Sequence, residues 1–207
     1  MLIVGGIAVV GMLQARGVSP SPQTSRVPLY LSVVALQLLF LWFINKGIRP
    51  YGRSLFDLAG RRWRSLKDGG TDLFLAIGLV VALRGINWLL RFAFGPAQAK
   101  IRFLLPQSGA EMLLWIVVAV VAGVSEEIVY RGYLQRQRWS ITRSLPVAVL
   151  TQALIFALAH MYQGWRAAAL TVVYGLAFGA LAAWRRSIMP SAIAHVVIDI
   201  IGALTAR

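Results

Sequence analysis

Long apolar runs constrain this chain more than any other feature of its sequence. Seven can be distinguished, at roughly 1–14, 28–45, 71–94, 110–130, 145–162, 167–184 and 188–205. Several approach the ~20 residues that an α-helix needs to cross a bilayer. The chain is 58% hydrophobic and 14% charged, whereas a soluble domain carries about a quarter charged residues. We therefore expect an all-α, polytopic transmembrane bundle of about seven to eight helices.

The length of 207 residues fits one integral-membrane domain over 1–207. The first stretch, MLIVGGIAVVGML, lacks the basic n-region and the cleavage site of a signal peptide, so we expect a short first helix there. The stretch LFDLAGRRWRSLKDGG, within about 53–68, is amphipathic and basic. It is expected to lie along the inner membrane interface as a helix or partial helix.

The basic residues cluster between the apolar runs, which explains the net charge of +14. Loops at these positions meet anionic headgroups, so membrane lipid is the expected partner and nucleic acid is not. The connections 46–67, 131–143 and 185–186 hold thirteen Lys and Arg residues, against six in the other connections and chain ends. Positive charge therefore favours a cytoplasmic N-terminus in the plasma (inner) membrane. The absence of cysteine excludes disulfides, a catalytic thiol and thiolate metal ligands.

Ionisable residues are rare within the apolar runs. Arg84 and Arg91 interrupt the third run and are expected to face the bundle interior or to snorkel. The acidic residues near loops are interpreted as interfacial groups in contact with water: Asp57, Asp68, Asp72 and Glu111. Five further groups lie in apolar surroundings, where a charge costs about 2.5–3.5 kcal/mol and usually marks function. They are Glu126, Glu127, His160, His195 and Asp199.

Helical spacing separates the two adjacent glutamates. Glu127 and Arg131 are four residues apart, which allows an ion pair on a helix. Glu126 is turned by about 100° and is left free. Two more polar or aromatic pairs share the four-residue spacing, Phe156 with His160 and His195 with Asp199. A different pair, Gly175 and Gly179, is interpreted as a small-residue surface for close helix packing.

Three short motifs carry a resemblance to a known family. SEEIVYR resembles the EExxxR motif of the CPBP family of intramembrane proteases, FALAH resembles its FxxxH motif, and HVVID resembles its HxxxN or HxxxD motif. That family includes the type II CAAX prenyl endopeptidases and bacterial abortive-infection and bacteriocin-immunity-like proteins. The motifs occur in the family's order, over a core of about 110–205. The resemblance implies a CAAX-protease-like fold and an intramembrane endopeptidase.

The resemblance also implies a role for each matching residue. Glu126 corresponds to the general base for a water molecule, and His160 to the group that holds or polarises that water. His195 and Asp199 correspond to the residues that stabilise the oxyanion, whereas Glu127, Arg131 and Phe156 are supporting residues. Asp199 departs from the asparagine form of the motif, since an ionised aspartate would repel an oxyanion. It is either protonated or orients His195, and we favour the second.

Several alternatives remain open from the sequence. Two histidines and a glutamate would suit Zn²⁺ with a water as fourth ligand, although no HExxH pair is present. A non-catalytic immunity or scaffold protein would use the same cavity to bind a peptide, and a transporter would use the buried groups as a proton relay. The expected substrate is a membrane-associated or C-terminal peptide, such as a prenylated CAAX peptide. The oligomeric state is left undetermined.

The depth of the candidate residues poses a geometrical problem. Glu126 and His195 would lie ~13 Å from the cytoplasmic side, whereas His160 would lie ~22 Å from the start of its segment. We therefore predict that the segment carrying His160 starts below the membrane surface or is tilted. The shared site is expected to open toward the cytoplasm or the inner leaflet.

Overall fold

The chain forms a bundle of α-helices in the computed structural model, which describes residues 25–94 and 104–205. The expected first helix at 1–14 lies outside the described residues. The all-α prediction is confirmed. The α-helices are α2 (Val27–Ile48), α3 (Leu55–Ala59), α4 (Leu66–Phe94), α5 (Gly109–Glu126), α6 (Arg136–Thr142), α7 (Leu145–Ala159), α8 (Trp165–Arg185) and α9 (Met189–Thr205). A π-helical segment, η3 (Glu127–Gln135), joins α5 to α6.

Four helical stretches in the described part of the chain are long and apolar enough to cross a membrane. They are Val27–Tyr51, Leu66–Ala93, Gly109–Thr142 and Trp165–Arg185. The apolar helices α7 and α9 are shorter. This composition identifies an integral membrane protein, as the apolar runs predict.

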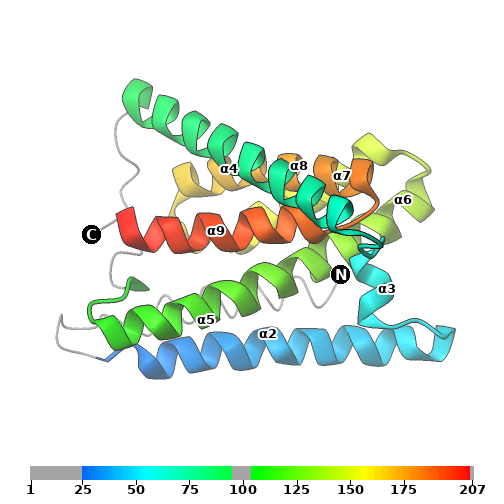
Figure 1. Cartoon of the computed structure of the whole chain (residues 1–207), viewed down its shortest axis with the longest axis horizontal. Helices are drawn as coiled ribbons and strands as arrows, with labels where there is room; N and C mark the ends of the chain where they lie inside the picture. Colours follow the sequence, from blue (N-terminus) through cyan, green and yellow to red (C-terminus); the bar gives the residue numbers. More distant parts are fainter. Residues whose placement is uncertain (1–24, 95–103, 206–207) are drawn as a thin grey trace.

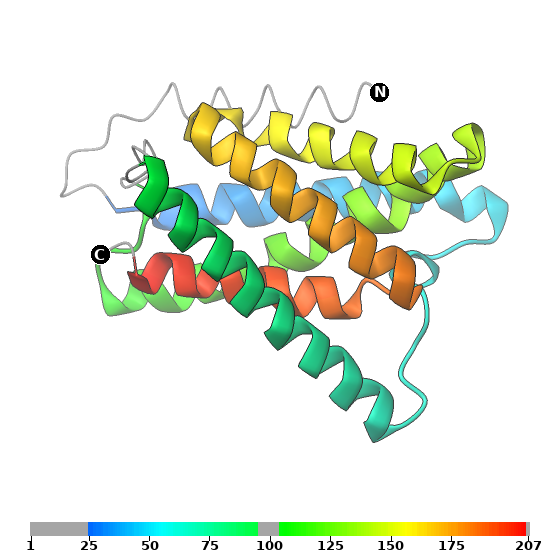
Figure 2. The same ribbon diagram turned by 90° about the horizontal axis from the view of Figure 1, so that it is seen from above.

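The bundle has two chemically different ends (Figure 1). The starts of α2, α5 and α8 lie at one end, together with the last turns of α4, α7 and α9. At the opposite end lie the connections from α2 to α4, from α6 to α7 and from α8 to α9, and the stretches around them, 46–67, 136–143 and 185–186, hold 12 of the 21 Lys and Arg residues. We call this the basic end and the other the distal end. Figure 2 shows α4 crossing the bundle obliquely.

Small residues bring α7 and α8 close together. A Cβ atom on Gly175 would lie 2.8 Å from the Cα of Ala153, and one on Gly179 would collide with the side chain of Gln152. The carbonyl of Gly175 accepts a 2.7 Å hydrogen bond from Gln152 Nε2. Because only glycine leaves this space, the packing role predicted for the glycine pair is confirmed.

The helix that carries Glu126 is longer than the expected segment 110–130. It continues through η3 and α6 to Thr142, and a tight turn then leads into α7. Glu126 lies about four turns before that turn and His160 about four turns after it. The two residues therefore reach the same level of an antiparallel pair of helices, which removes the expected difference in depth.

Ion pairs and backbone contacts tie both ends of the bundle. At the basic end, Asp72 is 1% exposed and pairs with Arg185 at 2.6 Å. At the distal end, the buried Glu111 accepts hydrogen bonds from the backbone N–H groups of Arg26 at 2.9 Å and Gln107 at 2.8 Å. The interpretation of Asp72 and Glu111 as water-exposed interfacial residues is therefore wrong. A carboxylate beside a loop can be buried when backbone or guanidinium donors satisfy it.

The stretch 53–68 is only partly helical. Ser54 caps α3, and the Asp57 side chain accepts a hydrogen bond from the Ser54 backbone N–H at 2.8 Å. After α3 the chain pairs with the α8–α9 connection, since Arg61 N–H donates to Arg186 O at 2.8 Å. This pairing joins α3, which packs on η3, to the start of α9. The amphipathic stretch thereby supports the segment that carries the motif glutamates.

Candidate active site

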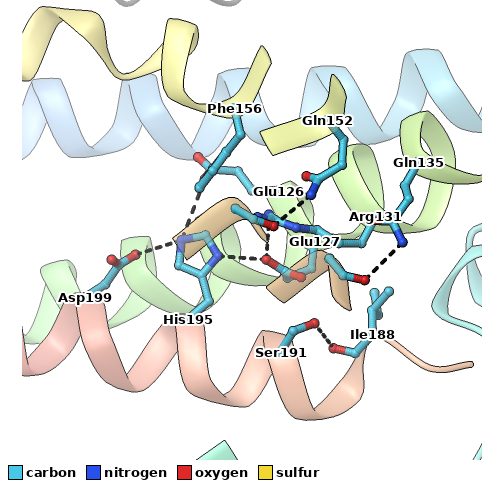
Figure 3. Close-up of polar contacts among 12 residues, drawn as sticks. Glu126, Glu127, Arg131, Gln135, Gln152, Phe156, Ile188, Ser191, His195 and Asp199 are labelled. Atoms are coloured by element: carbon cyan, nitrogen blue, oxygen red, sulfur yellow. Dashed lines mark hydrogen bonds and ion pairs between the residues drawn. The ribbon is translucent and has the colours of Figure 1, made fainter. Parts of the chain in front are cut away.

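A buried ion pair lies at the centre of the site (Figure 3). Arg131 Nη1 donates to Glu127 Oε1 at 2.7 Å, and neither side chain is exposed. The predicted pair is therefore confirmed. The guanidinium also lies over the rings of Phe156, 4.5 Å from the centroid, and Phe178, 5.2 Å from the centroid. These aromatic faces attract the cation in a place where its Nε and Nη2 atoms have no hydrogen-bond partner among the described residues.

His195 of α9 contacts three carboxylates. Its Nδ1 lies 3.2 Å from Glu127 Oε1, within hydrogen-bonding distance. Its Nε2 lies 3.7 Å from Glu126 Oε2 and 3.8 Å from Asp199 Oδ2. The hydrogen bond that orients the imidazole is thus made by Glu127, whereas the sequence analysis favoured Asp199. Asp199 faces the other ring nitrogen at ion-pair distance.

A residue of α2 holds the Glu126 carboxylate. Gln37 is buried and donates from Nε2 to Glu126 Oε1 at 3.0 Å. This contact leaves Oε2 as the oxygen that faces His195. The sequence gives no motif for Gln37, since it is one polar residue in an apolar segment far from Glu126. Its occurrence inside a membrane span was the only available signal.

His160 lies beside Phe156 just after α7 ends. Its Nδ1 is 2.8 Å from the Phe156 carbonyl oxygen, so the other ring nitrogen remains available. The Phe156 ring is 4.5 Å from the His160 ring and 5.8 Å from the His195 ring, between centroids. Phe156 therefore packs between the two histidines and fixes their separation. His160 and Glu126 make no direct ion pair in the described structure.

A single cavity nevertheless receives all four candidate catalytic side chains. It has a volume of about 470 Å³ and is lined by Glu126, His160, His195 and Asp199 among others. Tyr162, in the connection between α7 and α8, also lines it. Burial raises the pKa of Tyr162 to about 12, so its hydroxyl stays protonated at neutral pH and can donate a hydrogen bond. The cavity joins three motif segments that are distant in the sequence.

The cavity occupies the distal half of the bundle. Its wall uses the first half of α2, the first half of α8, the second half of α9 and the last turns of α4. All of these lie away from the basic end (Figure 1). If the basic end is cytoplasmic, the cavity lies toward the opposite side of the membrane, and the expected opening toward the cytoplasm or the inner leaflet stays a prediction.

The described histidine and carboxylate side chains of the site are not arranged as a metal centre. In residues 25–94 and 104–205, no group of three His, Asp or Glu side chains is arranged to hold a metal ion. The imidazoles of His160 and His195 are separated by the Phe156 ring, which contacts both. The zinc alternative thus lacks the convergent ligands that such a site requires.

Comparison with protein families connects this geometry to a known class. The family model described as type II CAAX prenyl endopeptidase Rce1-like matches residues 108–201. This segment, 94 of the 207 residues, is similar to the CAAX protease family. Searches of curated proteins and of solved structures gave no match. The segment matched to the CAAX protease family runs from the start of α5 into α9 and contains all three motifs, whereas α2 and α4 precede it.

Other residues of this candidate site were not identified from the sequence. Phe178 of α8 is fully buried and stacks on the His195 ring at 5.1 Å between centroids. Gln152 and Gln135 donate to the carbonyls of Gly175 and Gly179. Buried glutamines in apolar helices are a usable signal, since each must find a partner. The sequence does not mark Phe178 as a site residue, because an aromatic residue in an apolar run is expected in any core.

Proposed function

We propose that this protein is an intramembrane endopeptidase in which Glu126 activates a water molecule. The observation that carries the proposal is the placement of Glu126 Oε2 3.7 Å from His195 Nε2 at the wall of a shared cavity, while Gln37 holds Glu126 Oε1. One carboxylate oxygen is thus fixed, and the other is directed toward a ring that can donate or accept. A positioned carboxylate of this kind is suited to general-base catalysis.

The proposed reaction begins with water at Glu126 Oε2. Glu126 takes a proton as the water oxygen attacks the peptide carbonyl carbon, and a tetrahedral oxyanion forms. His160 positions the water, and a protonated His195 donates from Nε2 to the oxyanion. Glu126 then transfers its proton to the amine nitrogen as the C–N bond breaks. Glu127 and Arg131 act as positioning residues, since Glu127 fixes the opposite side of the His195 ring.

The proposed substrate is a membrane-associated or C-terminal peptide, and the family suggests prenylated CAAX peptides as one class. The cavity wall supports this proposal because it combines apolar side chains, such as Val118 and Ile198, with the polar site. The proposed location is the plasma (inner) membrane with the N-terminus and the basic end on the cytoplasmic side. In that orientation, peptides would enter the cavity from the distal side.

The test is peptidase activity of purified wild-type protein and of Glu126→Gln toward a library of membrane-anchored peptides. We expect cleavage by the wild type and its loss in Glu126→Gln, with unchanged thermal unfolding. Asp68→Asn is the matched control, because it makes the same type of change at the start of α4, in contact with Arg61 outside the cavity. Equal activity of wild type and Glu126→Gln would exclude Glu126 as the base.

The position of Asp199 favours a second candidate function, that of a peptide-binding protein without peptidase activity. A carboxylate lies where the family motif can have asparagine, and it faces His195 Nε2 at 3.8 Å. An ionised Asp199 would oppose an oxyanion at that position. Peptide binding without any cleavage by the wild type would favour this candidate, and Asp199→Asn would then be the variant in which to look for activity.

A further inference from the structure

The polar groups at the distal end of the cavity have no part in the chemistry proposed above. Arg84 and Asn87, one turn apart on α4, both line the cavity. They precede the segment that matches the family model. Arg91, two turns further along α4, is exposed and does not line the cavity. The two arginines of this apolar helix therefore have different surroundings.

Arg84 has no acidic partner among the described residues. Its one hydrogen bond in the described structure joins Nη2 to Thr205 Oγ1 at 3.3 Å. The two acidic side chains that share the cavity wall, Glu126 and Asp199, face His195 instead. A guanidinium carries five donors in a fixed fork, so most of its donors remain free to bind an anion. An unpaired arginine in a membrane helix is unfavourable unless it serves a function or reaches the headgroups.

An apolar wall separates the Arg84 end from the Glu126 end. Between the two ends, α5 contributes Val118, Ala119 and Ala122, and α9 contributes Ile198 and Ala203. The cavity therefore has an apolar strip on α5 and α9 between its two polar ends, with Asp199 on the same wall one turn from His195. This pattern fits a short apolar peptide segment that ends in an anionic group.

The distance between the two ends of the cavity can be estimated along helix α9. His195 marks the Glu126 end, and Thr205, which contacts Arg84, lies ten positions later in the same helix. At 1.5 Å per residue this corresponds to about 15 Å along the helix axis. An extended peptide covers about 3.3–3.6 Å per residue, so three to five residues would span that distance.

We propose that Arg84, supported by Asn87, is a carboxylate-binding subsite that anchors the C-terminal end of a peptide three to five residues from the bond at Glu126. The proposal rests on the peptide substrate of the proposed function and makes Arg84 its specificity-determining residue. A bidentate contact from guanidinium to carboxylate would fix both the direction and the register of the peptide. A positive charge is essential for this contact, and a planar fork of donors is what distinguishes arginine from lysine.

The experiment measures binding, which does not require catalysis. An N-terminally labelled apolar hexapeptide is prepared with a free C-terminal carboxylate and, separately, as the C-terminal carboxamide. Fluorescence anisotropy with the full chain in neutral-lipid nanodiscs gives both dissociation constants, using Glu126→Gln as background so that no peptide is consumed. We expect the carboxylate form to bind about tenfold more tightly, as for one charge-assisted interaction.

Arg84→Gln should remove this preference and leave carboxamide binding unchanged, whereas Arg91→Gln should retain the preference. Equal affinity for the two peptides in the Arg84-containing protein would overturn the proposal. So would an equal loss of both in Arg84→Gln, which would indicate that Arg84 acts through structure or through a lipid phosphate. A carboxylate preference that depends on Arg84 would stand even if no peptide were cleaved, so this test is separate from that of the proposed function.

Discussion

Gln37 Nε2 and Glu126 Oε1 are joined by a 3.0 Å hydrogen bond that links α2 to the first motif. The contact crosses from a helix before the family segment to a residue at the end of α5. It determines which Glu126 oxygen faces His195. A residue without any family motif thus helps to orient the proposed base.

Replacing Gln37 by leucine should lower kcat at least about tenfold with little change in KM, since a hydrogen bond to a charged group contributes about 1.5–3 kcal/mol. Steady-state kinetics with a cleavable membrane peptide would measure this change. Leu38→Ala, on the exposed side of α2, is the control. A rise in KM alone, or a matching fall in thermal stability, would contradict a positioning role.

Removing the guanidinium of Arg131 should destabilise the fold by about 3–5 kcal/mol, because the buried Glu127 would lose its 2.7 Å ion-pair partner. Denaturation of Arg131→Met in mixed micelles would measure the loss. The double variant Glu127→Gln/Arg131→Met should lose less than the sum of the two single variants. Additive losses would show that the 2.7 Å pair contributes no coupling.

Gly175→Ala should lower stability by about 1–3 kcal/mol, because the new methyl group would overlap Ala153 of α7. Gly78→Ala in α4 is the matched control, since nothing lies within 4 Å of its added Cβ. That control should be neutral or stabilising by about 0.5–1 kcal/mol. Thermal unfolding in detergent compares the two, and equal effects would count against close α7–α8 packing.

Peptidase activity should persist after prolonged treatment with a strong chelator, since the described histidines and carboxylates form no common metal-ligand group. Activity before and after chelation, with metal content measured by mass spectrometry, provides the test. Loss of activity that returns on adding Zn²⁺ would establish the metal-dependent alternative.

Orientation can be tested with single cysteines, because the chain has none of its own. Ser140→Cys places a thiol on α6 at the basic end, and Ser25→Cys places one before α2 at the distal end. A membrane-impermeant maleimide should label only the second in intact cells, in agreement with the positive-inside rule. The reverse labelling pattern would place the distal side of the cavity in the cytoplasm.

Much of the fold follows from the sequence because lipid imposes simple rules on it. The apolar runs predict most spanning helices within a few residues, and four-residue spacing predicts the Glu127–Arg131 pair. Helix length was harder to predict, since polar residues after Tyr130 resemble a loop although the chain continues through η3 and α6. Once the length of this helix is known, the depth of His160 in the bundle matches that of Glu126.

Partners across the bundle could not be predicted from the sequence. The contacts of His195 with Glu127 and Phe178 depend on the rotation of three helices about their axes, which hydropathy does not encode. Asp72 and Glu111 were misassigned for a related reason, since their donors come from remote or backbone groups. Local spacing therefore predicts contacts within one helix and leaves contacts between helices undetermined.

The cavity wall is divided between two parts of the chain. Residues of α5 to α9 bring the reactive groups, whereas α2 and α4 close the remaining sides with Gln37, Arg84 and Asn87. Changes in α4 can therefore alter which molecule fits without touching the reactive groups. Under the proposed function, two proteins with identical motifs but a different α4 would keep the same reactive groups and select different peptides.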